Sequence, residues 1–225
     1  MTVRDSQNKV VPTQVITNSN QTSYPYTIYF QASLPPLGVA TYFVEPLKRA
    51  AETHLAKPIE IHLPGECLRQ LDAGMPLTGR CKHLAKSEAN DFTISNDNYV
   101  LTFDGVSGLL KQLQRTGSSA ISLMQQYLQY PSSTDENQPS GAYIFRNAGN
   151  ATALAGSLTV TVWNGQYVQQ IEQVWQFSVN ISSFTPKLPA NITQVYRLYN
   201  GQGQRNTTNF IEVRGSLLFL PHLLI

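Results

Sequence analysis

Apolar and polar residues alternate at every second position in several short segments, which is the pattern of half-buried β-strands. The clearest segment, SLTVTVW, has two distinct faces: Leu158, Val160 and Val162 on one, and Thr159, Thr161 and Trp163 on the other. Alternation returns in WQFSV, where Trp175, Phe177 and Val179 share a face, and TQVYRLY (193–199) has the composition of a further strand. We therefore predict that the second half of the chain is built from strands.

Turn-forming residues separate these strands. Residues 26–32 and 39–45 are β-rich runs, divided by Pro35-Pro36 and Gly38, and residues 92–114 contain an Asn-Asp-Asn turn and an Asp104-Gly105 turn. Strands that follow one another at short intervals without a long helix are typical of two packed antiparallel sheets. The pattern predicts an all-β fold, an antiparallel β-sandwich preceded by part of a small β domain.

Two segments interrupt the pattern. Residues 47–91 contain many proline and glycine residues, so we interpret them as an irregular connection or insertion. Residues 215–225, GSLLFLPHLLI, are apolar without alternation and contain Pro221, so we expect a poorly packed tail that does not continue the sandwich. The predicted division is therefore 1–46 (small β domain), 47–91 (connection), 92–214 (part of the C-terminal sandwich) and 215–225 (tail).

Composition narrows the class of protein. The chain of 225 residues is 41% hydrophobic but only 13% charged, which favours a folded protein with large buried faces. Its net charge is +2 and no run of Lys or Arg forms a stripe, so we expect no nucleic-acid partner. The apolar end is shorter than the about 20 residues that span a bilayer. The polar start, MTVRDSQNKV, is not a signal peptide, so we expect the chain to be part of something longer.

Asparagine and cysteine bear on the cellular compartment. Five Asn-x-Ser/Thr sequons favour a glycosylated protein of the secretory route: Asn20, Asn150, Asn180, Asn191 and Asn206. The two cysteines, Cys67 and Cys81, match no zinc-ligand spacing. A disulfide between them would close a short loop, and two unpaired thiols are the equal alternative.

Local catalytic and metal-binding motifs are absent. None of the four histidines, His54, His62, His83 and His222, belongs to a His-x-Asp, His-x-His or His-Glu-x-x-His motif, and Gly-x-Ser-x-Gly does not occur. Asp135 and Glu136 are adjacent, whereas acid/base pairs of glycosidases face each other across a cleft. We predict no catalytic residue and no metal site in this chain. Arg197 lies within the predicted strand TQVYRLY, and we expect it to be buried and to pair with a carboxylate. Glu172 is the best candidate, because it is the only acid in the preceding strand candidate; the alternative is an Arg197 that points to solvent.

Several strings resemble glycoside hydrolase family 38, the lysosomal-type class II α-mannosidases, and they occur in the family's order. VRDSQNKVVPTQV and FQASLPPLGVATYFV are similar to its V-x-D-x-x-G-x-x-V-P-S-Q-V and F-x-A-x-V-P-P-L-G-Y-x-T-Y. ISNDNYVLTFDGVSGLLKQL, ENQPSGAYIFRN, NGQYVQQIEQ and TQVYRLYNGQ are similar to later family segments. The matches cover most of residues 1–46 and 92–204, although Asn147 replaces the family's usual proline and residues 47–91 match nothing we can place.

The resemblance implies a parent enzyme that removes terminal α-linked mannose from N-glycans by a retaining, zinc-dependent mechanism, in the lysosome or outside the cell. It implies that this chain is a fragment of a galactose-mutarotase-like supersandwich. The family's zinc ligands and nucleophile lie upstream, in an α/β catalytic domain that would be the partner of this chain. By motif position, Tyr143 would contact the mannose; the alternative is a Tyr143 packed in the sandwich.

We expect the chain alone to be inactive and to hold no cofactor. Two other functions stay open at this point. Its 11 tyrosines and two tryptophans would suit a non-catalytic carbohydrate-binding sandwich, because sugar faces stack on aromatic rings. A large exposed apolar patch would instead favour a structural module that covers a catalytic domain.

Overall fold

The structure is a computed structural model that contains only strands and connections in the residues it describes. These are residues 1–17, 25–46, 54–55, 59–63, 90–133, 135–141, 143–154, 156–179, 188–201 and 210–219. No helix in this part of the chain is long and apolar enough to cross a membrane. Apart from one short parallel pair, β3 with β6, every strand pairing in these ranges is antiparallel, which confirms the predicted fold class.

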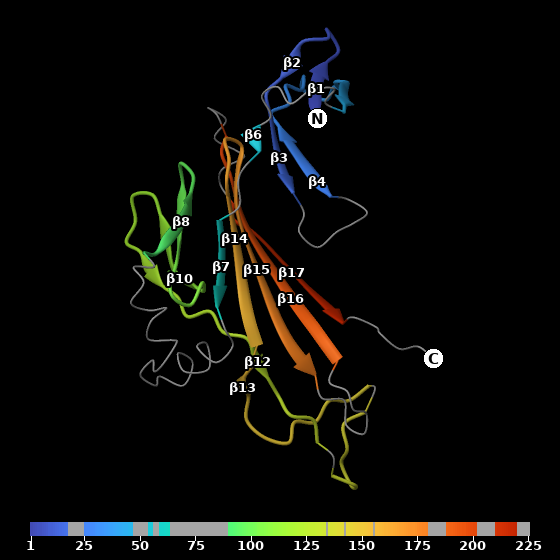
Figure 1. The fold of residues 1–225 in the computed structure, drawn as a ribbon, viewed down its shortest axis with the longest axis vertical. Helices are drawn as coiled ribbons and strands as arrows, with labels where there is room; N and C mark the ends of the chain where they lie inside the picture. The colour runs from blue at the N-terminus through green and yellow to red at the C-terminus, as the bar shows by residue number, and fades with distance from the viewer. Residues whose placement is uncertain are drawn as a thin grey trace.

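Two small sheets form the N-terminal part (Figure 1, top). The first has the order β2-β1-β5 and consists of Val10–Val11, Thr2–Asp5 and Tyr42–Glu45. The second has the order β4-β3-β6 and consists of Tyr26–Phe30, Thr13–Thr17 and His54–Leu55. Both β-rich runs expected before residue 46 are therefore strands, and the prolines between them form the predicted turn.

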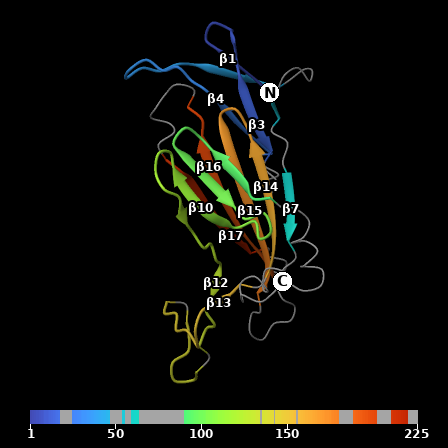
Figure 2. The ribbon, with the colours of Figure 1, turned by 90° about the vertical axis from the view of Figure 1, so that its left-hand side faces the viewer.

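Two larger sheets form the sandwich. One has the order β11-β10-β9-β8: Ile121–Ser122, Leu110–Arg115, Tyr99–Phe103 and Phe92–Ser95. The other has the order β17-β16-β15-β14-β7: Glu212–Phe219, Leu188–Tyr199, Val168–Val179, Gly156–Asn164 and Ile59–Leu63. Figure 2 shows the first sheet lying in front of the second.

Apolar residues from both sheets meet between the layers. Ile94, Leu101 and Phe103 come from one sheet, and Leu158, Ile171 and Leu198 are among those from the other; each is at most 2% exposed. Leu158, Val160 and Val162 all face this core, as the alternation predicts. The opposite face of β14 is also partly covered, since Thr161 and Trp163 are buried.

Polar side chains build the two predicted turns. Asn96 Oδ1 accepts the backbone N–H groups of Asn98 and Tyr99 at 2.9 and 2.8 Å. Asp104 Oδ1 accepts the N–H groups of Val106 and Ser107 at 3.0 and 2.7 Å. Short Asn and Asp side chains stabilise turns in this way, which is why the sequence located them correctly.

Two expectations about irregular segments are wrong in part. Residues 47–91 contain strands β6 and β7, and β7 pairs along its whole length with β14. Its sequence, IEIHL, alternates between Pro58 and Pro64, so these prolines bound a strand instead of preventing one. Likewise, residues 215–219 belong to β17, which pairs with β16 as far as Phe219. Backbone pairing with the 12-residue β16, not side-chain alternation, makes this segment a strand. Residues 220–225 lie outside the described part.

Candidate functional site

A long connection, residues 130–151, projects from the end of the sandwich between β12 (Leu128–Gln129) and β13 (Thr152–Ala153) (Figure 1, bottom). We call this connection the arm. At its base β12 and β13 pair antiparallel, and the pairing continues at the isolated Ser132–Asn147 bridge. The two sides of the arm are therefore held together near the sandwich, and its far part is presented away from it.

A hydrogen-bonded clasp closes the outer part of the arm. The Ser140 hydroxyl donates to the Arg146 carbonyl at 2.6 Å and accepts the Arg146 N–H at 2.9 Å. The Arg146 guanidinium donates to the Pro139 carbonyl at 3.0 Å, and the Ser140 N–H donates to the Ser133 carbonyl at 2.9 Å. Residues 140–146 thus form a closed loop, in which the Gly141 N–H also donates to the Ile144 carbonyl at 2.9 Å.

Tyr143 lies at the apex of this loop. It is 99% exposed, and its neighbours Ile144 and Phe145 are 55% and 60% exposed. The alternative that Tyr143 packs in the sandwich is therefore wrong for this chain. Three consecutive exposed apolar or aromatic residues are unusual on a surface without a partner.

Gly141 has no steric reason to be glycine within the described structure. A Cβ built on Gly141 meets nothing within 4 Å, and its φ is not in the left-handed region. A glycine in open space next to an exposed tyrosine leaves room for another body to approach the backbone.

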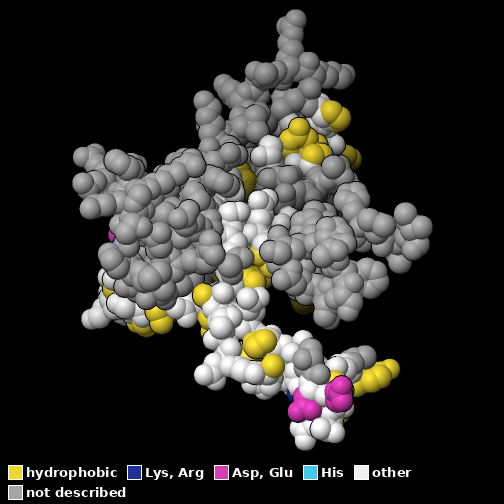
Figure 3. Space-filling model, turned by 60° about the horizontal axis from the view of Figure 1, so that its bottom comes forward, with side chains coloured by type: hydrophobic (Ala, Val, Ile, Leu, Met, Phe, Trp, Pro, Cys, Tyr) yellow, Lys and Arg dark blue, Asp and Glu magenta, His cyan; other side chains and the backbone are white. Residues whose placement is uncertain are grey.

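The arm also carries acidic side chains beside its hydrophobic ones (Figure 3). Asp135 and Glu136 are both exposed. The Asp135 carboxylate accepts the Asn137 N–H at 2.9 Å, so it builds a turn. The adjacent acids are thus part of the surface of the arm and do not face each other as an acid/base pair would.

A polar network that the sequence did not predict holds residues 125–127, just before the arm. Gln125 donates to Gln173 at 2.7 Å, and Gln173, only 1% exposed, donates to the Gly108 carbonyl at 2.6 Å. Tyr127 donates to Gln194 and packs against the Trp175 ring at a centroid distance of 5.1 Å. Burial raises the pKa of Tyr127. A polar residue at a core-facing position, such as Gln173 between Ile171 and Trp175, is the sequence signal that would have revealed this network.

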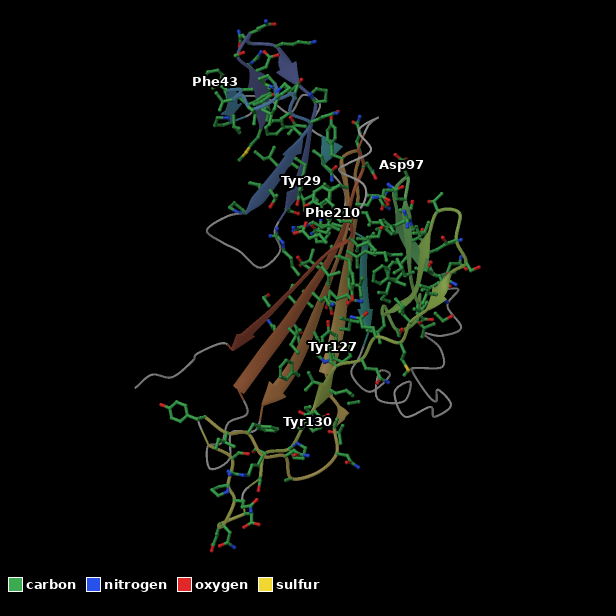
Figure 4. The ribbon with its side chains drawn as sticks, turned by 180° about the vertical axis from the view of Figure 1, so that it is seen from behind. Tyr29, Phe43, Asp97, Tyr127, Tyr130 and Phe210 are labelled. Carbon is green, nitrogen blue, oxygen red and sulfur yellow. The ribbon has the colours of Figure 1, made fainter. Side chains whose placement is uncertain are left out.

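A groove lies between the small sheets and the large sheet. This groove, about 290 Å³ in volume, is lined by residues 28–32, Tyr167, Val168, Tyr199 and Asn200. The rings of Tyr29 and Tyr199 meet edge to face at 6.4 Å, and Phe210 packs on Tyr199 at 5.4 Å. Figure 4 shows Tyr29 and Phe210 close together at this junction.

Gln14 joins the small sheets to the sandwich next to this groove. Its carboxamide accepts the N–H groups of Tyr167 and Val168, both at 2.9 Å, and donates to the Val168 carbonyl at 2.8 Å. Gln14 is 1% exposed. A Cβ at Gly165 would collide with the Gln14 amide, so the hairpin needs glycine there. Three hydrogen bonds from this buried side chain therefore connect the small sheets to the β14–β15 turn.

A charged cluster lies at the same end of the large sheet. Arg197 Nη1 is 3.4 Å from a Glu212 oxygen, and Arg197 Nε donates to Gln170 at 2.5 Å. Arg214 and Tyr199 also contact the Glu212 carboxylate. Arg197 thus pairs with a carboxylate, as predicted, but from Glu212 instead of the proposed Glu172. The register explains this correction, because Gln170 and Glu212 stand directly opposite Arg197, whereas Glu172 stands opposite Val195.

This cluster shifts the pKa values of two of its members, Glu212 and Tyr199. Burial alone would raise the pKa of Glu212, but the Tyr199 hydrogen bond and the charges of Arg197 and Arg214 outweigh it and lower that pKa below its ordinary value. Burial and the Glu212 carboxylate raise the pKa of Tyr199 to about 12. At neutral pH the carboxylate is therefore charged and the phenol is neutral, which is the pairing of states that the hydrogen bond requires.

The remaining predicted site residues are placed only in part. Asn150 is exposed on the arm, and Asn191 is half-buried in β16, opposite Gln176 and Leu218. Asn20, Asn180, Asn206, Cys67 and Cys81 lie outside the described residues. Within the part of the chain that the structure describes, no three His, Cys, Asp or Glu side chains are grouped so that they could hold a metal ion. The described residues therefore do not fit a zinc site.

Comparison with known proteins agrees with this architecture. Residues 94–220 match the family "Glycosyl hydrolases family 38 C-terminal domain", and residues 3–44 match "Lysosomal alpha-mannosidase-like, central domain". Among curated proteins, the chain is 29% identical over 206 residues to the lysosomal alpha-mannosidase of Homo sapiens and 27% identical over 182 residues to that of Dictyostelium discoideum. The matches cover 89% and 78% of this chain but only 17% of each relative.

Proposed function

The chain belongs to glycosyl hydrolase family 38, and we propose that it is the non-catalytic β portion of an α-mannosidase. The membership rests on the match of residues 94–220 to the C-terminal domain of that family. The parent enzyme would remove terminal α-linked mannose from N-glycans with retention of configuration. Its zinc ion and nucleophile would be held by an upstream α/β domain. The relatives are named lysosomal, which supports a lysosomal or secreted parent with glycans at sequons such as Asn150.

In this proposal Tyr143 contacts the mannose in the active site of the neighbouring domain. The observation that carries it is the position of Tyr143, 99% exposed at the apex of a closed loop. Its phenol offers one hydroxyl that both donates and accepts, and a ring face on which a sugar can stack. The clasp between Ser140 and Arg146 holds the loop before substrate arrives, so little ordering is needed on binding.

A chimeric enzyme tests this function. The matching segment of the Dictyostelium lysosomal alpha-mannosidase is replaced by this chain, and kcat/KM is measured on a chromogenic α-mannoside. We expect Tyr143→Ala to lower kcat/KM by about 10²-fold, since misplacing a substrate contact costs that order. Tyr143→Phe separates the hydroxyl from the ring, and Tyr130→Ala, also an exposed tyrosine, is the control. A chimera with Tyr143→Ala that is as active as the unsubstituted one would refute the role of Tyr143. The isolated chain should show no turnover with or without added zinc.

One observation favours a second function, carbohydrate binding outside an active site. The groove is lined by Tyr29, Tyr167 and Tyr199 together with the amide of Asn200. Aromatic faces beside a carboxamide suit a sugar ring with its hydroxyl groups. Binding of mannose oligosaccharides to the isolated chain, measured by calorimetry and abolished by Tyr167→Ala but not by Tyr143→Ala, would favour this function over the first.

A further inference from the structure

The connection between β4 and β5 contains a tight turn with an unusual residue at its corner. The Gly38 N–H donates to the Pro35 carbonyl at 3.0 Å, and Leu37 has a φ of 56°. Pro36 at the second turn position and positive φ at the third define a type II turn, whose third position normally holds glycine. Leu37 therefore occupies a conformation that its side chain disfavours, and strain of this kind is commonly retained at functional contacts.

The same turn exposes its apolar side chains almost completely. Leu37 is fully exposed, with a relative accessibility of 111%, and Val39 and Leu34 are 94% and 62% exposed. No charged residue occurs between Gln31 and Val44. Figure 2 shows this light-blue connection reaching beyond the edges of the sandwich. We call residues 34–39 the apolar turn.

Several contacts hold the apolar turn in place. A Cβ at Gly38 would collide with Pro35 Cγ, so the turn is packed against the proline ring. The Tyr42 hydroxyl accepts the Ser33 N–H at 2.9 Å, and the Tyr42 ring lies 5.1 Å from the ring of Phe30. Two prolines and these contacts make the turn rigid before any partner binds. Rigid apolar groups make good anchors because little conformational entropy is lost on binding.

We propose that the apolar turn inserts into an apolar pocket on the catalytic portion of the parent enzyme. This proposal rests on the proposed function. The chain corresponds to only 17% of the length of its relatives, so most of each relative is available to cover such a surface. An anionic membrane surface is a poorer occupant, since the turn and its flanks carry no Lys or Arg between residues 31 and 44.

The apolar turn and the arm would give two separate contacts with that portion. Figure 4 places Phe43, on β5 beside the apolar turn, and Tyr130, at the start of the arm, at opposite ends of the molecule. The apolar turn would contribute to assembly, whereas Tyr143 would contribute to substrate binding. The two roles therefore predict different phenotypes.

A two-piece reconstitution tests the inference. The tagged chain is co-expressed with the remainder of the Dictyostelium lysosomal alpha-mannosidase, and the amount of that remainder that co-purifies is measured. We expect Leu37→Asp to reduce co-purification at least tenfold, because a charge would enter an apolar pocket. Met124→Asp is the matched control and should leave co-purification unchanged. Met124 is also an exposed apolar residue, 80% accessible, but it lies outside the apolar turn. Tyr143→Ala should lower activity of the assembled enzyme without lowering co-purification.

Leu37→Gly provides a second, independent measurement. Glycine accepts positive φ, so this variant should raise the Tm of the isolated chain by about 2 °C while it lowers co-purification. Unchanged co-purification with both substitutions of Leu37 would overturn the inference, even if Tyr143→Ala reduces activity as proposed. A self-associated chain that Leu37→Asp converts to monomers in sedimentation analysis would also overturn it, since the occupant would then be a second copy.

Discussion

The guanidinium of Arg197 on β16 lies between two strands and bonds to a residue on each. Its Nη1 is 3.4 Å from the Glu212 carboxylate on β17, and its Nε donates to Gln170 on β15 at 2.5 Å. The side chains of Arg197 and Glu212 are 14% and 15% exposed. This ion pair therefore connects the edge strand β17 to the centre of the sheet in a largely dry environment.

Removing one member of this pair should destabilise the chain strongly. We expect Arg197→Met to lower the free energy of unfolding by about 3 kcal/mol, because the Glu212 carboxylate would lose a largely buried cationic partner. For a chain of this size that corresponds to a decrease in Tm of about 6–12 °C. The double variant Arg197→Met, Glu212→Leu should recover part of the loss. Arg4→Met, which breaks the more exposed Arg4–Glu45 pair, should cost less than about 1 kcal/mol. Equal melting of the Arg197→Met and Arg4→Met variants would contradict the prediction.

The lowered pKa of Glu212 predicts an acid-dependent loss of stability. A carboxyl group whose pKa is lower in the folded state stabilises that state above its unfolded pKa, about 4.3, and the stabilisation disappears as the pH falls through the folded value. Denaturant unfolding should therefore show falling stability below about pH 4.5. Glu212→Gln should be less stable at neutral pH and show a shallower decline on acidification. If the Glu212→Gln variant has the same pH profile as the unsubstituted chain, Glu212 is excluded as a source of the effect.

Gln14 should be essential for attachment of the small sheets. Gln14→Leu leaves the N–H groups of Tyr167 and Val168 without their acceptor, and we expect a loss of about 2–4 kcal/mol. Hydrogen exchange should accelerate at these two amides before it changes in β14 or in the rest of β15, residues 169–179. Gln7→Leu makes the same chemical change at an exposed position and should have almost no effect. Unaltered protection of Tyr167 and Val168 in the Gln14→Leu variant would show that another contact holds the junction.

The Ser140 clasp should control the arm and not the sandwich. Ser140→Ala removes both hydrogen bonds to Arg146, so the amides of residues 140–146 should exchange faster. The Tm should change by less than about 2 °C, because the arm lies outside the core. In the chimeric enzyme the same variant should lower kcat/KM, and Ser140→Thr, which keeps a hydroxyl, should restore it. If the Ala and Thr variants behave alike, the clasp does not position Tyr143.

Gly141→Ala distinguishes a steric clash with a neighbouring domain from an effect on the stability of this chain. The added Cβ meets nothing within 4 Å in the described chain, so the Tm of the isolated chain should rise or stay the same. In the chimeric enzyme kcat/KM should fall if another domain approaches this backbone. Full activity of the chimera that carries Gly141→Ala would mean that the space around Gly141 is open to solvent in the assembled enzyme.

Much of the architecture was accessible from local chemistry. Alternation identified β14 and β15, because the strand period of two places every second side chain in the core, whereas β16 was predicted from the composition of TQVYRLY. The side chains of turn residues such as Asn96 and Asp104 bond to backbone groups two or three positions away. A few consecutive residues are therefore enough to predict these turns. The exposed state of Tyr143, in contrast, depends on how the whole arm folds.

By itself, then, the sequence determined the strand identity of most elements, the sandwich class and the family, because each depends on periodicity, turn chemistry or the order of short motifs. Only the tertiary structure decided that Arg197 pairs with Glu212, that β7 and the end of β17 complete the large sheet, and that Gln14 joins the two parts of the chain. The physical reason is that partners across strands are chosen by register. The register of β16 depends on the connections to its neighbours and on which face of the packed sheet is buried, so the sequence of β16 alone does not show which residues stand opposite Arg197.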